Sequence, residues 1–405
     1  MCERNDPAAV AEGLRRRLAE ARRALADGAA EEAGACYAAV LAEVEEYEGC
    51  EGCAEHGEGE ERAERGEHAE HGGHRLTAER AAALLGLGES ALESGELTDA
   101  LGYFERAGDL LADGPAPARA PVLRGRAVAH YLTGELRYAV HLLESGLAEL
   151  ARAEPQDPDA LVLLHATAIG PYMDMGAHHH AARAAESALA LAPRVSDPAL
   201  VARAHRSVAR TLLAQGRHAE ADASLATAAE LYDRLGLRTE LAHCHWMRGY
   251  VRAQAGQLAG AEEELRQALL MLGETRAALY RSQVAVELAD VLHRRGSSGD
   301  AAELLAGVLG DFSSERGAVH AAAAHRLLGI IAEDAHDTEA AEEHYVRALS
   351  LLERAGAAGD LADLCRLLGD LLRRGGRTEA ALDAYRTGLG HRTAPGSTTL
   401  GPAQL

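Results

Sequence analysis

The chain is short of several residue types, and each shortage excludes a class of protein. Only 3% of its 405 residues are aromatic, and valine and isoleucine are scarce beside alanine and leucine, so the apolar residues favour helices over strands. No run of about 20 apolar residues is present that could span a bilayer. The first residues lack the basic and apolar regions of a signal peptide. We therefore expect a cytoplasmic protein that does not act at a membrane.

Positive charge and cysteine are scarce as well. Lysine is absent, so all 41 cations are arginines, which we attribute to coding bias in a GC-rich genome. Against 63 acidic residues they leave a formal charge of −22, and a chain this negative repels nucleic-acid phosphates at long range. The six scattered cysteines do not form the dense framework of a secreted disulfide scaffold. We expect no binding to nucleic acid by the chain itself.

What the chain does contain is a repeat. A small residue on an apolar stretch is followed by a glycine or an equivalent, then by an alanine, a large apolar residue and another small one. The landmark alanines are Ala100, Ala139, Ala181, Ala221, Ala261, Ala301, Ala341 and Ala381. From Ala181 onward the period is forty residues. A fixed period of about 20 to 50 residues is typical of solenoids, whose units bury their apolar faces against one another.

Residues 81–111 illustrate one unit. Two apolar stripes have helical spacing, formed by Leu84, Leu87, Gly88 and Ala91 and by Leu97, Ala100, Leu101, Phe104 and Ala107. Gly95 lies between them and is expected to end the first helix, because glycine tolerates the left-handed conformation of a C-terminal cap. Each unit is therefore predicted to be a helical hairpin.

The order of leucine, glycine, alanine and an aromatic residue or leucine resembles the tetratricopeptide repeat (TPR). Five copies keep one register, in residues 208–228, 249–268, 288–305, 328–348 and 368–388, and a weaker first copy contains Ala21, Gly28, Ala33, Tyr37 and Val40. The resemblance implies an all-α, right-handed superhelical α-solenoid of about nine hairpins. The forty-residue unit is similar to the helical-repeat domains of bacterial, especially actinobacterial, regulators. One departure is that His336 occupies the position of a turn glycine.

Four segments follow from the repeat. We predict a first hairpin in residues 7–44, a flexible acidic insert in 45–76, eight hairpins in 77–390 and a disordered tail in 391–405. The insert is expected to be mobile because it has almost no apolar residues, and its part from 45 to 74 carries eleven glutamates against two arginines.

The insert also contains potential metal ligands. Cys50, Cys53 and His56 follow one another at three-residue intervals, and a later histidine such as His71 could complete the four ligands that zinc prefers. A His- and Glu-rich tract can also bind metals loosely or not at all. We therefore expect no cofactor, and zinc bound by this insert is an alternative hypothesis.

The resemblance implies that ligands bind to the first helices of the hairpins. In the central units, the predicted groove residues are Arg203, Arg206, Arg210, His243, Trp246, Tyr250, Asp290, His293 and Arg294. Arginine forks match carboxylates, and the aromatic residues offer anchor area. The pattern predicts a groove for a protein or peptide segment that is acidic or ends in a carboxylate, although a row of arginines is also typical of a merely solvated face.

No phosphate-binding glycine loop, nucleophile elbow or zinc-protease motif is present, so we expect no enzyme. Cys244 lies between His243 and His245, but adjacent helical residues diverge, and we expect Cys244 to pack in the core. Three functions remain open. The protein could be an interaction scaffold or adaptor with a regulatory role, a ligand- or peptide-sensing regulator that changes superhelix shape, or a metal-binding or delivery protein acting through residues 45–76.

Overall fold

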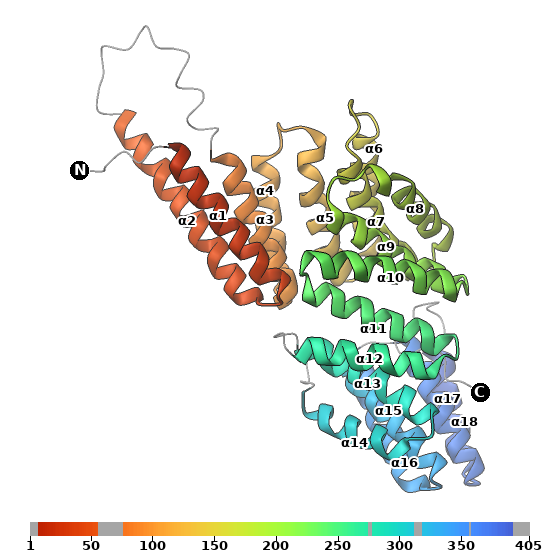
Figure 1. The fold of residues 1–405 in the computed structure, drawn as a ribbon. Helices are drawn as coiled ribbons and strands as arrows, with labels where there is room; N and C mark the ends of the chain where they lie inside the picture. Colours follow the sequence, from red (N-terminus) through yellow and green to blue (C-terminus); the bar gives the residue numbers. More distant parts are fainter. Residues whose placement is uncertain (1–6, 56–75, 274–277, 312–317, 356–357, 392–405) are drawn as a thin grey trace. The chain divides into compact units, whose positions relative to one another are not determined.

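The computed structural model describes residues 7–55, 76–273, 278–311, 318–355 and 358–391 (Figure 1). Within these ranges the chain forms eighteen α-helices, two short 3-10 helices and no strand. The α-helices follow one another as nine pairs, each with a turn between its members, which confirms the predicted all-α repeat fold. None of the described helices is long and apolar enough to cross a membrane.

The chain divides into two compact units. Unit 1 comprises Met1–Met173, His178–Thr211 and Arg234–Arg238, and unit 2 comprises Asp174–Ala177, Leu212–Asp233 and Thr239–Leu405, in both cases within the described ranges. Each unit has its own buried apolar residues. Each is therefore described by itself.

Unit 1 contains the first helices of the chain and most of α9. Their bounds are α1 Pro7–Ala26, α2 Ala30–Glu55, α3 Thr77–Ser94, α4 Leu97–Leu110, α5 Ala116–Leu132, α6 Leu136–Leu150, α7 Pro158–Asp174, α8 His178–Leu191 and α9 Pro198–Ala214. A 3-10 helix, η1, covers Ala192–Arg194.

Unit 2 contains most of α10 and the remaining helices. Their bounds are α10 His218–Leu235, α11 Arg238–Gln254, α12 Leu258–Gly273, α13 Ala278–Arg294, α14 Ser298–Val308, α15 Ala318–Asp334, α16 Thr338–Ala355, α17 Ala358–Arg374 and α18 Thr378–His391. The 3-10 helix η2 covers Leu309–Asp311.

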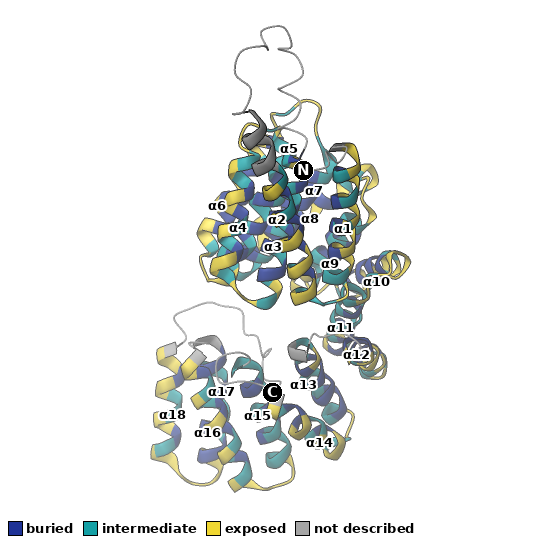
Figure 2. Ribbon diagram, turned by 90° about the vertical axis from the view of Figure 1, so that its left-hand side faces the viewer, coloured by how far each residue is buried: buried dark blue, intermediate teal, exposed yellow. Residues whose placement is uncertain are grey.

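The landmark alanines mark the most tightly packed positions. All eight are at most 1% exposed, and buried residues lie along one side of the helices while exposed residues lie along the other (Figure 2). Alanine suits these positions because it lets helix backbones approach closely and has a high helix propensity. The repeat therefore specifies packing.

Glycines of the first helices make room for aromatic rings of the second helices. A Cβ atom at Gly88 of α3 would lie 2.6 Å from the Phe104 ring of α4, and one at Gly125 of α5 would lie 2.3 Å from the same ring. In unit 2, a Cβ atom at Gly329 of α15 would lie 2.4 Å from the ring of Tyr345 of α16. The two units thus use the same packing device.

The turns inside the hairpins are closed by residues with positive φ. Gly95 has a φ of 77°, its N–H donates to Leu92, and the next N–H donates back to Ala91. His336 has a φ of 63° and makes the same pair of bonds to Glu333 and Ala332. These are Schellman caps, so His336 does occupy a glycine position, as the sequence predicted.

The structure differs from the expectation at the start of the insert. A loop was expected from residue 45, but α2 continues to Glu55. The reason is that the apolar stripe does not stop at the buried Val44, because Tyr47 packs against the core of unit 1. Glu45 also forms ion pairs with Arg80 and Arg106. The remainder of the insert, 56–75, and the tail from 392 lie outside the described residues.

Candidate functional site

The first candidate site is a hollow in unit 1 with a volume of about 220 Å³, which we call the arginine hollow. It is lined by Arg124, Ala127, Val128, Tyr131, Leu132, Ala166, Thr167, Ile169, Gly170, Pro171, Arg203, Arg206, Ser207 and Arg210. The structure therefore brings the three arginines that the sequence singled out on α9 to one hollow, together with Arg124 of α5.

Helix geometry explains why these arginines converge. Arg203, Arg206 and Arg210 are spaced three and four residues apart, so they share one face of α9. Gly170 of α7 leaves space between the helices, and a Cβ atom there would lie 3.3 Å from Nη1 of Arg210 and 3.9 Å from the hydroxyl oxygen of Tyr131. A larger residue at 170 would crowd this part of the hollow.

The charged residues that line the arginine hollow are all cationic. Four arginines line it, and none of the described lining residues is acidic. Arg124 forms an ion pair with Glu89 of α3 at 2.8 Å, and Glu89 itself is 43% exposed. Guanidinium groups in such an arrangement can bind a carboxylate with paired hydrogen bonds.

The second candidate site is a hollow in unit 2 with a volume of about 280 Å³, which we call the tryptophan hollow. It is lined by Trp246, Tyr250, Ala253, Gln254, Leu265, Gln283, Val286, Glu287, Asp290, Val291, His293, Arg294, His320, Ala323, Arg326, Leu327 and Ile330. These residues come mainly from α11, α13 and α15, the first helices of three successive hairpins.

Glu287 is the most unusual group of the tryptophan hollow. Burial raises its pKa to about 8, although a hydrogen bond from Trp246 partly opposes this shift, and the nearby Asp290 adds to it. Its Oε2 atom is buried and has no hydrogen-bond partner. Burial, with smaller effects of Glu287 and Asp290, also raises the pKa of the Tyr250 hydroxyl.

The arginines of the tryptophan hollow lie beside acidic groups. Arg294 donates to the carbonyl of Ala253 at 2.8 Å and to Asp290 at 3.5 Å. Burial lowers the pKa of Arg326, and the nearby carboxylates of Asp290, Asp363 and Asp360 oppose this shift. The guanidinium charges of this hollow therefore have protein carboxylates near them.

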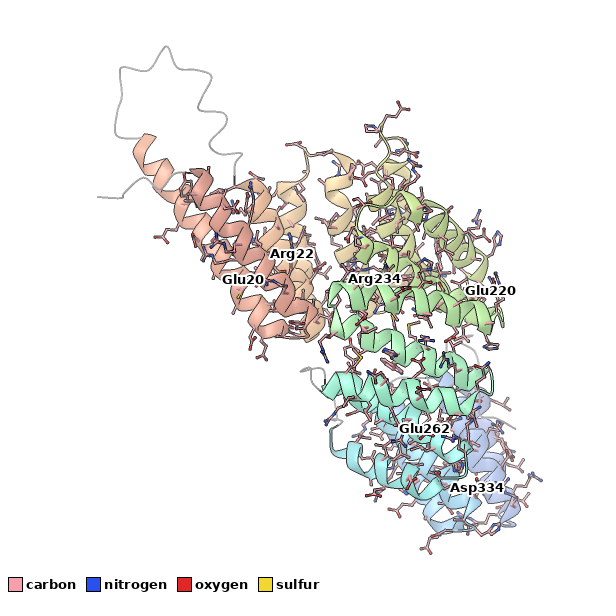
Figure 3. The ribbon with its side chains drawn as sticks, in the orientation of Figure 1. Glu20, Arg22, Glu220, Arg234, Glu262 and Asp334 are labelled. Carbon is pink, nitrogen blue, oxygen red and sulfur yellow. The ribbon has the colours of Figure 1, made fainter. Side chains whose placement is uncertain are left out.

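Two predicted groove histidines make contacts within unit 2. His293 lies 3.2 Å from Asp334, which is labelled in Figure 3 together with Glu262, the ion-pair partner of Arg295. His243 is not among the described residues that line the tryptophan hollow. Its ring packs at 4.8 Å from the ring of Tyr280 and at 6.1 Å from that of Trp246.

The predicted groove residues thus belong to different units. Arg203, Arg206 and Arg210 lie in unit 1, whereas the predicted residues from 243 to 294 lie in unit 2. Sequence reasoning missed Glu287, because a glutamate on an amphipathic helix is usually solvated. Its burial depends on α11 and α15, which are distant in sequence, and no local signal indicates it.

Two further sets of candidates from the sequence are Cys244 and the possible zinc ligands. Cys244 is fully buried, as expected for a core residue. Among the described residues, no cluster of three histidine, cysteine or acidic side chains could hold a metal ion. The zinc hypothesis is not tested by this, because His56, His71 and the side chains of Cys50 and Cys53 lie outside the described residues. It stays a prediction.

Searches against protein-family models and curated proteins found no match. Solved structures do match the fold. The apo form of the quorum sensor NprR from B. thuringiensis has a TM-score of 0.58 at 13% identity, covering 94% of this chain and 99% of that one. A Rap protein complexed with Competence and Sporulation Factor has a TM-score of 0.56 at 14% identity, covering 94% and 98%.

A third structure is aspartyl phosphate phosphatase F from Bacillus subtilis, with a TM-score of 0.54 at 12% identity, covering 100% of this chain and 98% of that one. Identities this low establish the fold alone. The match over nearly the whole length of each chain agrees with the repeat pattern of the sequence, and this chain has the fold of a TPR-like helical-repeat protein.

Proposed function

We propose that this protein is a non-catalytic interaction protein with a regulatory role, which binds a protein or peptide segment through the arginine hollow. The segment presents a carboxylate there, either from an acidic side chain or from its own C-terminus. The observation that carries the proposal is the convergence of four arginines on a hollow whose described lining includes no acidic residue. Binding rather than catalysis is favoured because arginines supply charge and hydrogen bonds but are not nucleophiles or bases near pH 7.

The solved structures with the same fold support this proposal. One Rap protein was solved in complex with Competence and Sporulation Factor, so a repeat protein of this size and fold holds a factor. For our chain, the arginine hollow is the surface to which we assign such a role. Its volume of about 220 Å³ is below the range of about 300–1,000 Å³ typical of small-molecule pockets, so it suits one anchoring group of a longer segment.

The test uses a short peptide with two glutamates, blocked at both ends, and its counterpart with two glutamines. The glutamate peptide should bind at least about tenfold more tightly, a difference of about 1.4 kcal/mol. Added salt should reduce the difference, because the charges are partly exposed. A third peptide with a free C-terminal carboxylate and no glutamate distinguishes the two sources of the carboxylate.

The variant for this test is Arg206→Gln combined with Arg210→Gln, and the matched control is Arg183→Gln. Arg183 is an exposed arginine of α8 that is not among the residues of the hollow. The double variant should lose the preference for glutamate, whereas the control should keep it. If the folded double variant prefers the glutamate peptide as strongly as the unchanged protein does, the proposed function is wrong.

A sensor is the second candidate function. It is favoured by the fold match to a protein described as a quorum sensor, which extends over 94% of this chain. A sensor changes shape when its ligand binds, whereas a passive adaptor does not. Small-angle scattering with and without the glutamate peptide separates the two: a changed curve supports the sensor, and an identical curve at saturation supports the adaptor.

A further inference from the structure

The tryptophan hollow contains an incomplete polar contact. The indole N–H of Trp246 donates to the carboxyl group of Glu287, but the buried Oε2 atom of Glu287 has no partner. Buried polar atoms are nearly always paired in folded proteins, because an unpaired one loses its hydration without compensation. A buried acceptor that lines a hollow is therefore a natural place for a donor from outside the chain.

The walls around Glu287 favour a positively charged donor. The aromatic rings of Trp246 and Tyr250 also line the hollow, and aromatic faces attract cations. Asp290 is a second carboxylate in the same lining, close enough to Glu287 to influence its protonation. Two acids and two aromatic rings are a suitable set for one ammonium or guanidinium group.

The protein's own cations leave this position open. Arg294 contacts Asp290 and the carbonyl of Ala253. Arg326 lies near Asp290, Asp360 and Asp363. Burial lowers the pKa of His320, whose ring lies 2.7 Å from the amide of Gln283, so this histidine is neutral near pH 7. None of the ion pairs or hydrogen bonds described above joins these groups to Oε2 of Glu287.

We propose that the tryptophan hollow binds one cationic group of a protein or peptide ligand, a guanidinium or an alkylammonium, and that Glu287 receives it between Trp246 and Tyr250. The volume of about 280 Å³ suits a single side chain or a terminal amine. This site shares no residue with the arginine hollow. Either site can therefore be disproved while the other stands.

Binding of a cation at Glu287 has a consequence for protons. The pKa of the Glu287 carboxyl is about 8, so this group is mostly protonated at pH 7. A bound cation favours the ionised form, so binding releases a proton. The charged or titratable groups that line the hollow with Glu287 are Tyr250 from α11, Asp290, His293 and Arg294 from α13, and His320 and Arg326 from α15. Because Glu287 ionises as pH rises towards its pKa of about 8, affinity for a guanidinium should rise from pH 6 to 8, and Glu287→Gln should lose this rise.

The probe is N-acetyl-arginine methylamide, whose single charge is a guanidinium. Trp246 is the sole tryptophan of the chain, so its fluorescence reports binding at this hollow. We expect saturable fluorescence changes with this probe and at least about tenfold weaker binding of the neutral citrulline analogue and of the glutamate analogue. The lysine analogue and alanine amide, which has a free amine, distinguish a side-chain cation from a terminal amine.

The variant is Glu287→Gln, and Glu339→Gln, an exposed glutamate of α16, is the matched control. Glu287→Gln should weaken binding of the arginine probe at least about tenfold, while the control should bind it as the unchanged protein does. Circular dichroism verifies that each variant is folded. The inference is overturned if folded Glu287→Gln binds the probe normally, or if the unchanged protein does not distinguish the arginine probe from its citrulline analogue.

A second measurement needs no variant. Calorimetric titration of the arginine probe at pH 7 in two buffers with different ionisation enthalpies gives the number of protons released. The proposal predicts a release approaching one proton per bound probe, whereas a value of zero would contradict the assignment of Glu287 as the receiving carboxyl group.

Discussion

In unit 1, four arginines face a hollow whose described lining has no acid, whereas in unit 2 the hollow combines Glu287 and Asp290 with Arg294 and Arg326. The helices that carry the two hollows nevertheless pack in the same way. Phe104 in unit 1 and Tyr345 in unit 2 each occupy space left by a glycine of the preceding helix. The small positions of the repeat therefore determine how helices pack, while the positions free to vary determine which charged residues line each hollow.

Two ion-paired carboxylates, one in each unit, differ in how far they are buried. In unit 2, the buried carboxylate of Glu264 on α12 lies 2.7 Å from His245 and 3.0 Å from both Arg248 and Arg252 of α11. Glu264→Gln should have the largest effect on stability, about 3 kcal/mol, because removing one partner leaves charges poorly compensated in a partly buried place. Chemical denaturation followed by circular dichroism measures the loss.

The corresponding change in unit 1 is Glu89→Gln, which removes one ion-pair partner of Arg124. Glu89 is 43% exposed, so solvent screens the pair and the expected loss is below about 1 kcal/mol. Equal losses for Glu264→Gln and Glu89→Gln would contradict the expected difference between these two ion pairs.

The effect of Glu287→Gln on stability depends on pH. The folded protein holds the Glu287 proton up to a pKa of about 8, whereas the unfolded chain releases it near the ordinary glutamate pKa of 4.5. The unchanged protein therefore loses stability as pH rises from 4.5 to 8, and the variant avoids this loss. We expect equal stabilities of the two proteins near pH 4 and a more stable variant at pH 9.

Denaturation curves at these two pH values test the pH dependence. A variant that is less stable than the unchanged protein at pH 9 would show that Glu287 is ionised and well compensated in the folded state, which contradicts the assigned protonation.

Another prediction concerns the feature that the units share. Gly88→Ala and Gly329→Ala should each destabilise the protein by about 1 kcal/mol, because overpacking costs about 1–3 kcal/mol and the higher helix propensity of alanine returns about 1 kcal/mol. The Cβ contacts would be 2.6 Å with Phe104 and 2.4 Å with Tyr345. Similar shifts of the denaturation midpoint support a common scaffold, and a large difference between the two variants argues against it.

Much of the fold could be predicted from the sequence because it depends on local spacing. The forty-residue interval of the alanines places the helical pairs, and the position of His336 in that interval identifies it as a cap, which its φ of 63° confirms. The continuation of α2 to Glu55 was missed, because it depends on the packing of Tyr47 against the core of unit 1, and the acidic composition around it indicated a loop.

The candidate sites were predictable only in part. The spacing of Arg203, Arg206 and Arg210 indicates a shared helical face without any knowledge of the fold. Their meeting with Arg124, and the burial of Glu287 beside Trp246, require neighbouring repeats to cover one another. Contacts between residues so distant in sequence leave no periodic signal in either helix.

The most direct test measures two ligands against two variants. The blocked glutamate peptide and N-acetyl-arginine methylamide are each titrated into the protein carrying Arg206→Gln with Arg210→Gln and into the protein carrying Glu287→Gln. If one hollow prefers anions and the other cations, the Arg206→Gln, Arg210→Gln variant should bind only the glutamate peptide more weakly. Glu287→Gln should bind only the arginine probe more weakly. The account of two chemically distinct hollows is contradicted if each folded variant binds both ligands equally more weakly. It is also contradicted if neither variant changes the affinity for either ligand.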